Sequence, residues 1–355
     1  MNKAVLENWG NPSSLHTLGM NAEIAVDNAR ECVAKFIGAL PKEIIFTSCG
    51  TEANNMAVMS AFYRKNRGNR IITTAIEHPS VLKATENLKS FGFEVITLKP
   101  DGNGVINLSD LEEALNEKTV LVSVMLVNNE TGAIQPVKEA VELTRKKSPN
   151  AFFHCDAVQA FGKMPVNVKS LGVDMLTASG HKIHAPKGIG FLYLSQKTHI
   201  APLLLGGGQE NGMRSGTECV PLICALQGAV EDLPKLDLAL KTRRELYDYT
   251  EKLLLDNSLA TINSAKDGLP YVLNVSVNGY RSETLLHFLE RKNIFVSSGS
   301  ACSKGNVSYV LKEMGKDNKS IDSALRISFS RFTTKEDIDL FVEELKNATK
   351  CLRKA

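Results

Sequence analysis

The sequence predicts an α/β protein with a large domain on a mostly parallel sheet and a smaller α+β domain after it. Between residues 43 and 194, short apolar segments rich in β-branched residues alternate with amphipathic helical patterns. This alternation is typical of a parallel sheet covered by helices on both faces. Beyond about residue 232 long charged helices replace it, and 355 residues are enough for two domains. We therefore expect one domain at 1–232 and a second at 233–355.

The individual elements follow from local signals in chain order. A helix at 1–9 is broken by Gly10 and Pro12, and a glycine turn at Gly50 opens the third helix directly after a strand. The expected strands of the first domain are 43–47, 70–75, 94–98, 120–127, 151–156, 174–178 and 190–194. Its expected helices are 1–9, 20–38, 50–64, 79–91, 108–116, 136–147 and 221–231. The second domain is expected to contain helices at 238–256, at 283–290, ending at 314 and beginning at 335, with strands at 271–277, 294–296 and 324–329.

Composition and charge restrict the class of protein. A formal net charge of +3, with 23% charged residues, argues against an electrostatic surface for nucleic acid or membrane. No apolar run approaches the roughly 18 residues of a membrane span, and no signal peptide opens the chain. The 7 cysteines form no CxxC pair, so they are expected to be thiols of a cytoplasmic protein, with no zinc or disulfide framework.

The candidate reactive lysine is Lys182, which follows the apolar strand at 174–178. Asp156 ends the preceding strand, and α/β sheets keep their chemistry at the carboxyl ends of their strands. An amine that forms a Schiff base and a carboxylate that keeps a pyridine nitrogen protonated are what a pyridoxal phosphate site needs. An ordinary ion pair at the sheet edge is the alternative that these two residues alone leave open.

Two loops carry further candidate groups. The turn at Gly50 leads into a helix N-terminus, whose free N–H groups and dipole suit a phosphate, although a capped helix start after glycine is also commonplace. Cys302 lies in a segment of small polar residues at 297–305. Such surroundings favour an accessible thiol over the buried inert cysteine that is the usual alternative, and Lys304 would favour the thiolate.

Ten motifs along the chain together resemble one family. They are Asn11-Pro-Ser-Ser-Leu-His16, Phe46-Thr-Ser-Cys-Gly-Thr-Glu52, Glu77-His78, Val127-Asn-Asn-Glu-Thr-Gly132, His154-Cys-Asp-Ala-Val-Gln159, Ser179-Gly-His-Lys182, Gly206-Gly-Gly-Gln-Glu210, Met213-Arg-Ser-Gly-Thr217, Ser297-Ser-Gly-Ser-Ala-Cys302 and Leu325-Arg-Ile-Ser328. The series resembles that of the cysteine desulfurases, pyridoxal phosphate enzymes of the class V aminotransferase group and of fold type I. The likeness runs in order from about residue 8 to the C-terminus.

The resemblance implies a role for each matching residue. The implied catalytic residues are Lys182, which holds the cofactor and moves the Cα proton; His78, which stacks on the ring; and Cys302, which takes sulfur from L-cysteine as a persulfide and releases alanine. The implied cofactor-binding residues are Gly50, Thr51, Ser179 and His181 at the phosphate, Asp156 at the pyridine nitrogen, Gln159 at the phenolic oxygen, Asn129, and Thr217 from the second subunit of a homodimer. Arg326 and Asn129 are the implied ligands of the substrate carboxylate, for which the planar guanidinium fork is suited.

The implied partner is a sulfur acceptor such as an iron–sulfur scaffold protein, and Cys302 could ligate a transferred cluster, with no resident metal expected. The sequence departs from the family at Cys49 and Cys155, in a slightly short segment after Cys302, and at its start. There an expected segment of some two dozen residues before Asn11 is missing. A lyase acting on selenocysteine or cystine and a truncated non-catalytic relative therefore remain open as alternatives.

Overall fold

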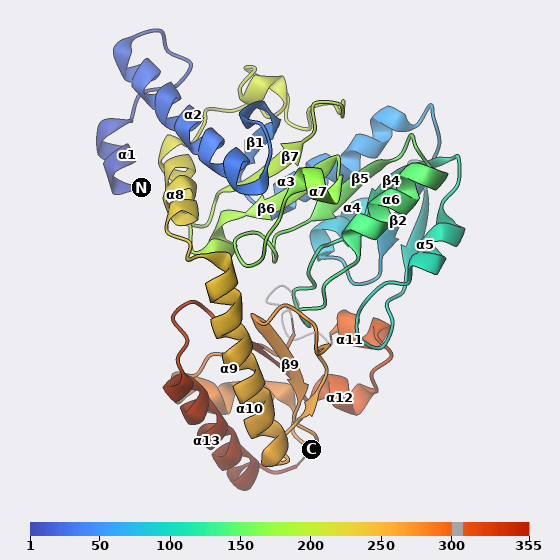
Figure 1. Ribbon diagram of the computed structural model, residues 1–355, viewed down its shortest axis with the longest axis vertical. Coiled ribbons are helices and arrows are strands. Elements are labelled where there is room, and N and C mark those ends of the chain that lie inside the picture. The colour runs from blue at the N-terminus through green and yellow to red at the C-terminus, as the bar shows by residue number, and fades with distance from the viewer. Residues whose placement is uncertain (300–307, 355) are drawn as a thin grey trace. The chain divides into compact units, whose positions relative to one another are not determined.

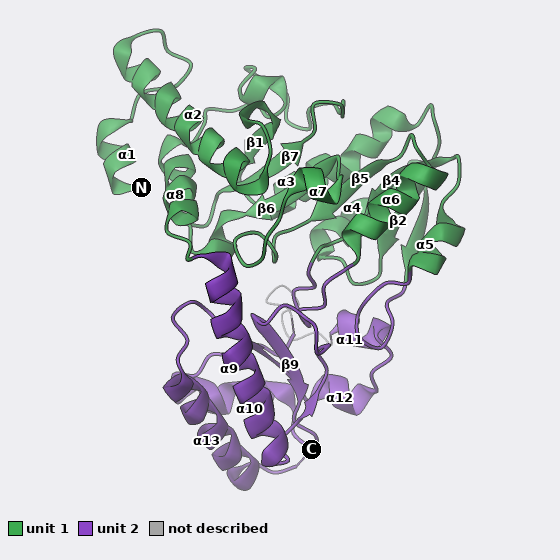
Figure 2. Ribbon diagram, viewed as in Figure 1, with its two compact units in different colours: residues 1–98, 108–126, 136–234 green, residues 99–107, 127–135, 235–355 purple. Residues whose placement is uncertain are grey.

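The computed structural model describes residues 1–299 and 308–354, which form two compact units (Figure 2). Unit 1 contains residues 1–98, 108–126 and 136–234, and unit 2 contains 99–107, 127–135 and the chain from 235. The boundary between the two units near residue 234 lies close to the expected domain boundary at residue 232. The two inserted segments, 99–107 and 127–135, had no signal in the sequence. The assignment of functions to two domains stays a prediction.

Unit 1 is built on a seven-stranded sheet in the order β1-β7-β6-β5-β4-β2-β3 (Figure 1). Its strands are β1 Ile44–Thr47, β2 Arg70–Thr74, β3 Glu94–Leu98, β4 Thr119–Ser123, β5 Phe152–Asp156, β6 Met175–Ser179 and β7 Gly190–Leu194. Strand β7 runs antiparallel to β1 and β6, and the other neighbouring pairs are parallel. The prediction of a mostly parallel sheet is therefore confirmed.

Helices cover both faces of this sheet (Figure 1). They are α1 Asn2–Glu7, α2 Thr17–Ile37, α3 Gly50–Met59, α4 Pro79–Lys89, α5 Leu108–Ala114, α6 Val137–Lys147, α7 Val168–Leu171 and α8 Val220–Glu231, with 3-10 turns η1 Pro41–Glu43, η2 Ser60–Arg64, η3 Gly180–Ile183 and η4 Glu210–Gly212. Helix α3 packs on α4, α6 packs on α5 and α7, and α2 packs on α8. Nearly continuous burial of β4, β5 and β6 accounts for their uninterrupted apolar sequences.

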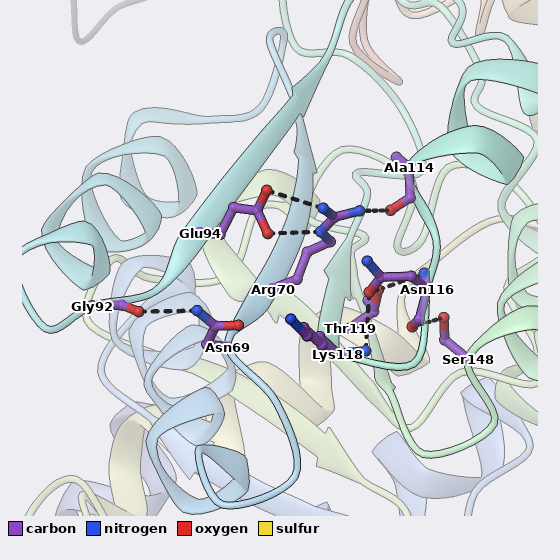
Figure 3. A network of polar contacts seen from close by, with 9 residues as sticks. All are labelled: Asn69, Arg70, Gly92, Glu94, Ala114, Asn116, Lys118, Thr119 and Ser148. Atoms are coloured by element: carbon purple, nitrogen blue, oxygen red, sulfur yellow. Dashed lines mark hydrogen bonds and ion pairs between the residues drawn. The ribbon is translucent and has the colours of Figure 1, made fainter.

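The edge of the sheet at β3 is held by polar contacts, which Figure 3 shows from close by. Arg70 of β2 donates from Nε and Nη2 to the two carboxylate oxygens of Glu94 at 2.9 and 3.0 Å, and from Nη1 to the carbonyl of Ala114 at 2.8 Å. Ser148 donates to the carbonyl of Asn116 at 2.7 Å. These contacts fix the outer strands at the end of the sheet from which β2 and β3 begin.

Unit 2 is a three-stranded antiparallel sheet, in the order β10-β9-β8, with helices packed against it. Its elements are β8 Thr261–Ile262, β9 Val272–Ser276, β10 Ala324–Ser328, α9 Leu236–Asp256, α10 Ser282–Glu290, α11 Tyr309–Glu313, α12 Asn318–Asp322 and α13 Lys335–Cys351. Its core includes Leu254, Leu273, Leu325 and Leu345, each fully buried. The expected α+β character is confirmed.

Two sequence expectations about elements were wrong. The residues 294–296 form no strand, and the chain there makes only an isolated bridge between Ser297 and Arg326. The strand expected at 120–127 ends at Ser123, because its apolar continuation is buried in a loop, with 127–135 passing into unit 2. Apolar runs do not separate a buried loop from a strand. Within the described residues no helix has the length and apolar character required to cross a membrane.

Candidate active site

Lys182 lies on the short 3-10 turn η3 that directly follows β6. Gly180 at the start of the turn donates its N–H to the carbonyl of Ile189 at 3.0 Å, and a Cβ at Gly180 would lie 3.0 Å from Ala185 Cβ. His184 ends the turn in the left-handed region, with φ of 68°. This tight connection presents Lys182 at the carboxyl end of β6, as expected.

Asp156 ends β5 and is 4% exposed. Its Oδ1 accepts the N–H of Val158 at 2.9 Å, and its Oδ2 accepts the side-chain amide of Asn54 at 2.7 Å. Burial raises the pKa of the Asp156 carboxyl, and these hydrogen bonds and the charges of His78 and Lys182 only partly offset that effect. Asp156, His78 and Lys182 are thus near enough for their charges to act on one another.

His78 is the N-cap residue of α4, and its Nδ1 accepts the N–H of Ser80 at 3.2 Å. The same nitrogen lies 2.8 Å from the Ser80 hydroxyl. Burial lowers the pKa of His78; the Asp156 charge opposes this shift and the Lys182 charge adds to it. The histidine is therefore held as a neutral ring next to a carboxylate and an amine.

Sequence reasoning missed Asn54 and Ser80, which connect two of the predicted site residues. Asn54 is 1% exposed and donates to both Asp156 and Ser80. A signal was present: asparagine is a poor helix former, yet Asn54 sits one turn into α3, four residues after Gly50. A polar residue at a buried helical position usually has a specific partner.

The predicted phosphate residues gather at the start of α3 and the end of β6. A Cβ at Gly50 would lie 2.9 Å from Val158 Cγ2 and 3.4 Å from Ser179 Cβ, so only glycine lets the helix start approach so closely. Ser179 Oγ lies 2.9 Å from Nδ1 of His181. Burial, together with the Lys182 charge, lowers the pKa of His181. Among the described residues, no side chain caps this helix, which leaves its N-terminal dipole available to an anion.

The remaining predicted cofactor-binding residues of unit 1 are Thr51, Gln159 and Thr217. Thr51 is exposed on the first turn of α3. Gln159 accepts from the ammonium of Lys163 at 2.9 Å through Oε1. Thr217 is exposed and helps to line a cavity of about 210 Å³, together with Ser48 and Arg214. Its contribution to a second subunit stays a prediction.

An ion pair connects the start of α3 with the 213–217 motif. Arg214 Nε donates to Glu52 Oε1 at 2.8 Å, and Ser48 N donates to Glu52 Oε2 at 2.8 Å. Burial works to raise the pKa of Glu52, but the bonds from Arg214 and Ser48 lower it on balance. Glu52 therefore serves as an ionised anchor for the loop before α3.

Two fully buried titratable groups, Glu77 and His154, lie close in the chain to His78 and Asp156. Glu77 accepts from Met125 N at 2.7 Å and from Thr74 Oγ1 at 2.9 Å, and burial raises its pKa to about 8. His154 of β5 lies 2.8 Å from Ser123 Oγ on β4 and 3.0 Å from Thr177 Oγ1 on β6. Burial lowers the pKa of His154 to about 3, so it stays neutral. The row of three side chains crosses three adjacent strands.

The two departures at cysteine differ in environment. Cys155 is fully buried, and burial raises the pKa of its thiol well above the usual value, which makes it inert. Cys49 is half-buried at the N-cap of α3, next to Gly50. In the described part of the chain, nothing gives either thiol a catalytic role.

The predicted substrate ligands lie in unit 2. Arg326 of β10 donates from Nη1 to the carbonyl of Asn129 at 3.1 Å, and its Nη2 donates to Ser297 Oγ at 3.4 Å. The neighbouring Glu130 is 1% exposed, and its Oε2 accepts from Ser308 Oγ at 2.5 Å. Burial raises the pKa of Glu130, although Ser308 and the Arg326 charge oppose the shift. Cys302 lies outside the described residues.

The groups assembled in unit 1 fit pyridoxal phosphate. Asp156 is a buried carboxylate of the kind that a pyridinium nitrogen requires, Lys182 supplies the amine, and the cradle at Gly50 leaves room for a phosphate on a helix N-terminus. A mostly parallel sheet with this site at the carboxyl ends of its strands defines a pyridoxal phosphate-dependent enzyme.

The comparisons with known proteins give the family. The chain belongs to the class V aminotransferases, since the model of the family described as "Aminotransferase class-V" matches residues 1–341. It is 42% identical over 350 residues to a cysteine desulfurase of Trichormus azollae, covering 97% of this chain and 87% of the relative.

Solved structures agree with this assignment. A protein titled "NIFS-LIKE PROTEIN" is 38% identical, with a TM-score of 0.94, and the match covers 99% of this chain and 94% of that one. A structure titled "SspA in complex with cysteine" is 34% identical, with a TM-score of 0.82 and 94% coverage of both chains. The predicted resemblance, fold and cofactor are thereby confirmed.

Proposed function

We propose that this protein is a cysteine desulfurase that converts L-cysteine to L-alanine and leaves the sulfur as a persulfide on Cys302. The similarity to a cysteine desulfurase over 97% of the chain carries this conclusion. The grouping of Lys182, Asp156 and His78 supports it, because a desulfurase requires an amine, a pyridinium partner and a ring-stacking group at one site.

Lys182 and His78 are the proton-handling groups of the proposal. Bound pyridoxal phosphate supplies an electron sink for the electron pair released at the substrate Cα. Lys182 would take the Cα proton of the substrate as a general base and return it. The lowered pKa of His78 keeps its ring neutral near neutral pH, which suits stacking and hydrogen bonding.

Substrate orientation is assigned to unit 2. Arg326 has a planar fork that matches a carboxylate in two parallel hydrogen bonds. Its contact with the Asn129 carbonyl fixes the guanidinium on one side. Asn129 is 7% exposed, and its Oδ1 has no hydrogen-bond partner among the described residues. A buried amide of this kind is suited to a polar substrate or cofactor group.

Sulfur transfer is assigned to Cys302. Its thiolate attacks the sulfur of L-cysteine, the Cβ–S bond breaks, and an S–S bond forms. The electron pair of the broken bond stays on the carbon fragment, which gains a proton and departs as alanine. We further propose a cytoplasmic homodimer, with Thr217 acting in the partner's site, and an iron–sulfur scaffold protein as the acceptor.

The test is an absorbance spectrum of the purified protein followed by turnover with L-cysteine. We expect visible absorbance of the lysine-bound cofactor and equal amounts of alanine and sulfide in the presence of a thiol reductant. Cys302→Ser is expected to keep the absorbance and lose the persulfide, and Cys351→Ser, on an exposed cysteine of α13, is the control. Unchanged turnover in Cys302→Ser would contradict the persulfide assignment, and faster reaction with selenocysteine or cystine would favour a lyase.

A further inference from the structure

A continuous chain of hydrogen bonds connects Asp156 with His78 through Asn54 and Ser80, two residues without a proposed role so far. Asn54 Nδ2 donates to Asp156 Oδ2 at 2.7 Å and to Ser80 Oγ at 2.8 Å. Ser80 Oγ lies 2.8 Å from His78 Nδ1. All four side chains belong to unit 1, and Asn54, Ser80 and Asp156 are buried.

The direction of each bond follows from the donors and acceptors available. A carboxylate only accepts, so the group of Asn54 that faces Asp156 is the NH₂. Both of its hydrogens are then used, and Asn54 Oδ1 has no partner within the part of the chain that is described. The reversed amide would place that oxygen against the Asp156 carboxylate, which is electrostatically unfavourable. The orientation of Asn54 is therefore determined by Asp156.

The same accounting determines the proton on His78. The backbone N–H of Ser80 points to His78 Nδ1 at 3.2 Å, so this nitrogen presents a lone pair. The Ser80 hydroxyl, 2.8 Å from the same nitrogen, must then donate to it, while the hydroxyl oxygen accepts from Asn54. Two donors on Nδ1 require a lone pair there, and the single proton of the neutral ring must then reside on Nε2.

Protonation of His78 would oppose this arrangement, because an Nδ1–H would meet the Ser80 N–H. The charged groups that act on the ring are Asp156, which favours the imidazolium, and Lys182 and His181, which disfavour it when protonated. Burial also favours the neutral form. The chain through Ser80 thus adds a specific preference for one tautomer to a general preference for neutrality.

We propose that Asn54 and Ser80 are positioning residues that fix His78 as the neutral Nε2–H tautomer and hold the Asp156 carboxylate in one orientation. The proposal rests on the function proposed above, in which His78 and Asp156 act on the same cofactor ring. Asn54 joins them through rigid secondary structure, since it lies on α3 and Ser80 lies on the first turn of α4.

The test is nitrogen NMR of the holoenzyme with ¹⁵N-labelled histidine, in which His78→Gln identifies the His78 signals. We expect the parent to show an Nε2–H tautomer near neutral pH. Ser80→Ala removes the hydroxyl donor, and Asn54→Ala removes the group that orients it. Each should mix the two tautomers and raise the pKa of His78 by about one unit, the tenfold change typical of losing one hydrogen bond.

Matched variants separate this role from a structural one. Asn55→Ala changes the adjacent, half-buried asparagine of α3, whose amide donates to the Thr51 carbonyl at 2.9 Å, and should leave the His78 signals unchanged. Ser80→Thr retains the hydroxyl and should restore the parent tautomer, together with the acid limb of the pH–rate profile. If Asn54→Ala does not fold, Ser80→Ala still provides the measurement.

The outcomes distinguish this proposal from the proposed function. An Nδ1–H tautomer in the parent, or unchanged His78 signals in both Asn54→Ala and Ser80→Ala, would overturn the positioning role. A parent enzyme that makes no alanine from L-cysteine, yet shows the expected nitrogen signals and their loss in Ser80→Ala, would support the hydrogen-bond chain and overturn only the proposed reaction.

Discussion

Asp156 in unit 1 and Glu130 in unit 2 are both carboxylates buried beside predicted site residues, and burial raises the pKa of each. Asp156 accepts hydrogen bonds at both oxygens, from Val158 two residues away and from Asn54 on α3. Glu130 accepts at Oε2 only from Ser308, and its Oε1 has no partner among the residues described. The first carboxylate is held on both sides, and the second on one.

The difference lies in where the partners come from. The chain from Asp156 to His78 uses a strand end, a helix and the first turn of another helix, which fold into place with the sheet. Glu130 lies in the loop 127–135, and its partner Ser308 is 178 residues further along the chain. The proposed cofactor-binding residues around Asp156 are therefore held by regular structure, whereas the proposed substrate-binding residues of unit 2 depend on long-range contacts between loops.

Lys182→Ala should have the largest effect of these substitutions, and it acts on the proposed cofactor-binding residues of unit 1. The variant loses the Schiff-base amine and the general base, so alanine formation should fall by at least about 10³-fold. It also removes one of the charges that partly offset the raised pKa of Asp156, while Glu130 is unaffected. Alanine assays and cofactor absorbance measure the effect, with exposed Lys169→Ala as the control. A variant with parent-like turnover would contradict the assignment.

Acidification should weaken unit 1 through His154. Its pKa is about 3 in the folded protein and about 6.5 when unfolded, so below pH 6.5 the unfolded chain binds a proton that the folded protein does not. With respect to His154, the free energy of unfolding should therefore have its full value above pH 6.5 and should be about 3 kcal/mol lower at pH 4.

Hydrogen exchange at several pH values should locate this loss in unit 1. His154→Gln can still hydrogen-bond Ser123 and Thr177 but does not titrate, so its stability should depend less on pH. Equal loss of protection in unit 2, or an unchanged pH dependence in His154→Gln, would contradict the assignment to His154.

Arg326→Lys should separate the proposed substrate-binding role of unit 2 from the proposed cofactor-binding role of unit 1. Lysine keeps the positive charge but lacks the planar fork, so kcat/KM for L-cysteine should fall about tenfold, mainly through a higher KM. Cofactor absorbance, which depends on unit 1, should stay unchanged. Arg281→Lys, which changes an arginine with a 64% exposed side chain, is the matched control. A loss of cofactor absorbance in Arg326→Lys would show that the two roles are not separable.

Ser308→Ala should weaken the contact that holds Glu130 on one side. It removes the hydrogen bond to buried Glu130 and the N-cap of α11, which together should cost about 1–3 kcal/mol of unfolding free energy. Thr334→Ala removes only an exposed N-cap and should cost about 1 kcal/mol. In a Glu130→Gln background the cost of Ser308→Ala should shrink. Denaturant unfolding measures the free energy of unfolding of each single variant and of the double variant. An equal cost of Ser308→Ala in the parent and in the Glu130→Gln background would exclude coupling between Ser308 and Glu130.

Sequence patterns predicted the parts of the site that rest on strand ends. Lys182 follows the buried strand β6 and Asp156 ends the buried strand β5, and the apolar runs of these strands predict both positions. An asparagine inside the predicted helix was a local signal, but Asn54 was missed because its partners depend on the packing of α3 against β5. The false strand at 294–296 arose because short apolar segments have the same composition in a strand and in a packed loop.

The segment 127–135 has a consequence for how the protein is synthesised and dissected. Ser264 donates to the carbonyl of Thr131 at 2.6 Å, Leu269 donates to that of Gly132 at 2.8 Å, and Asn274 donates to that of Glu130 at 3.1 Å. These carbonyls leave the ribosome more than a hundred residues before their partners. A C-terminal fragment from residue 235 would lack them and would not fold as an autonomous piece, whereas a split protein that supplies 1–234 in trans restores them.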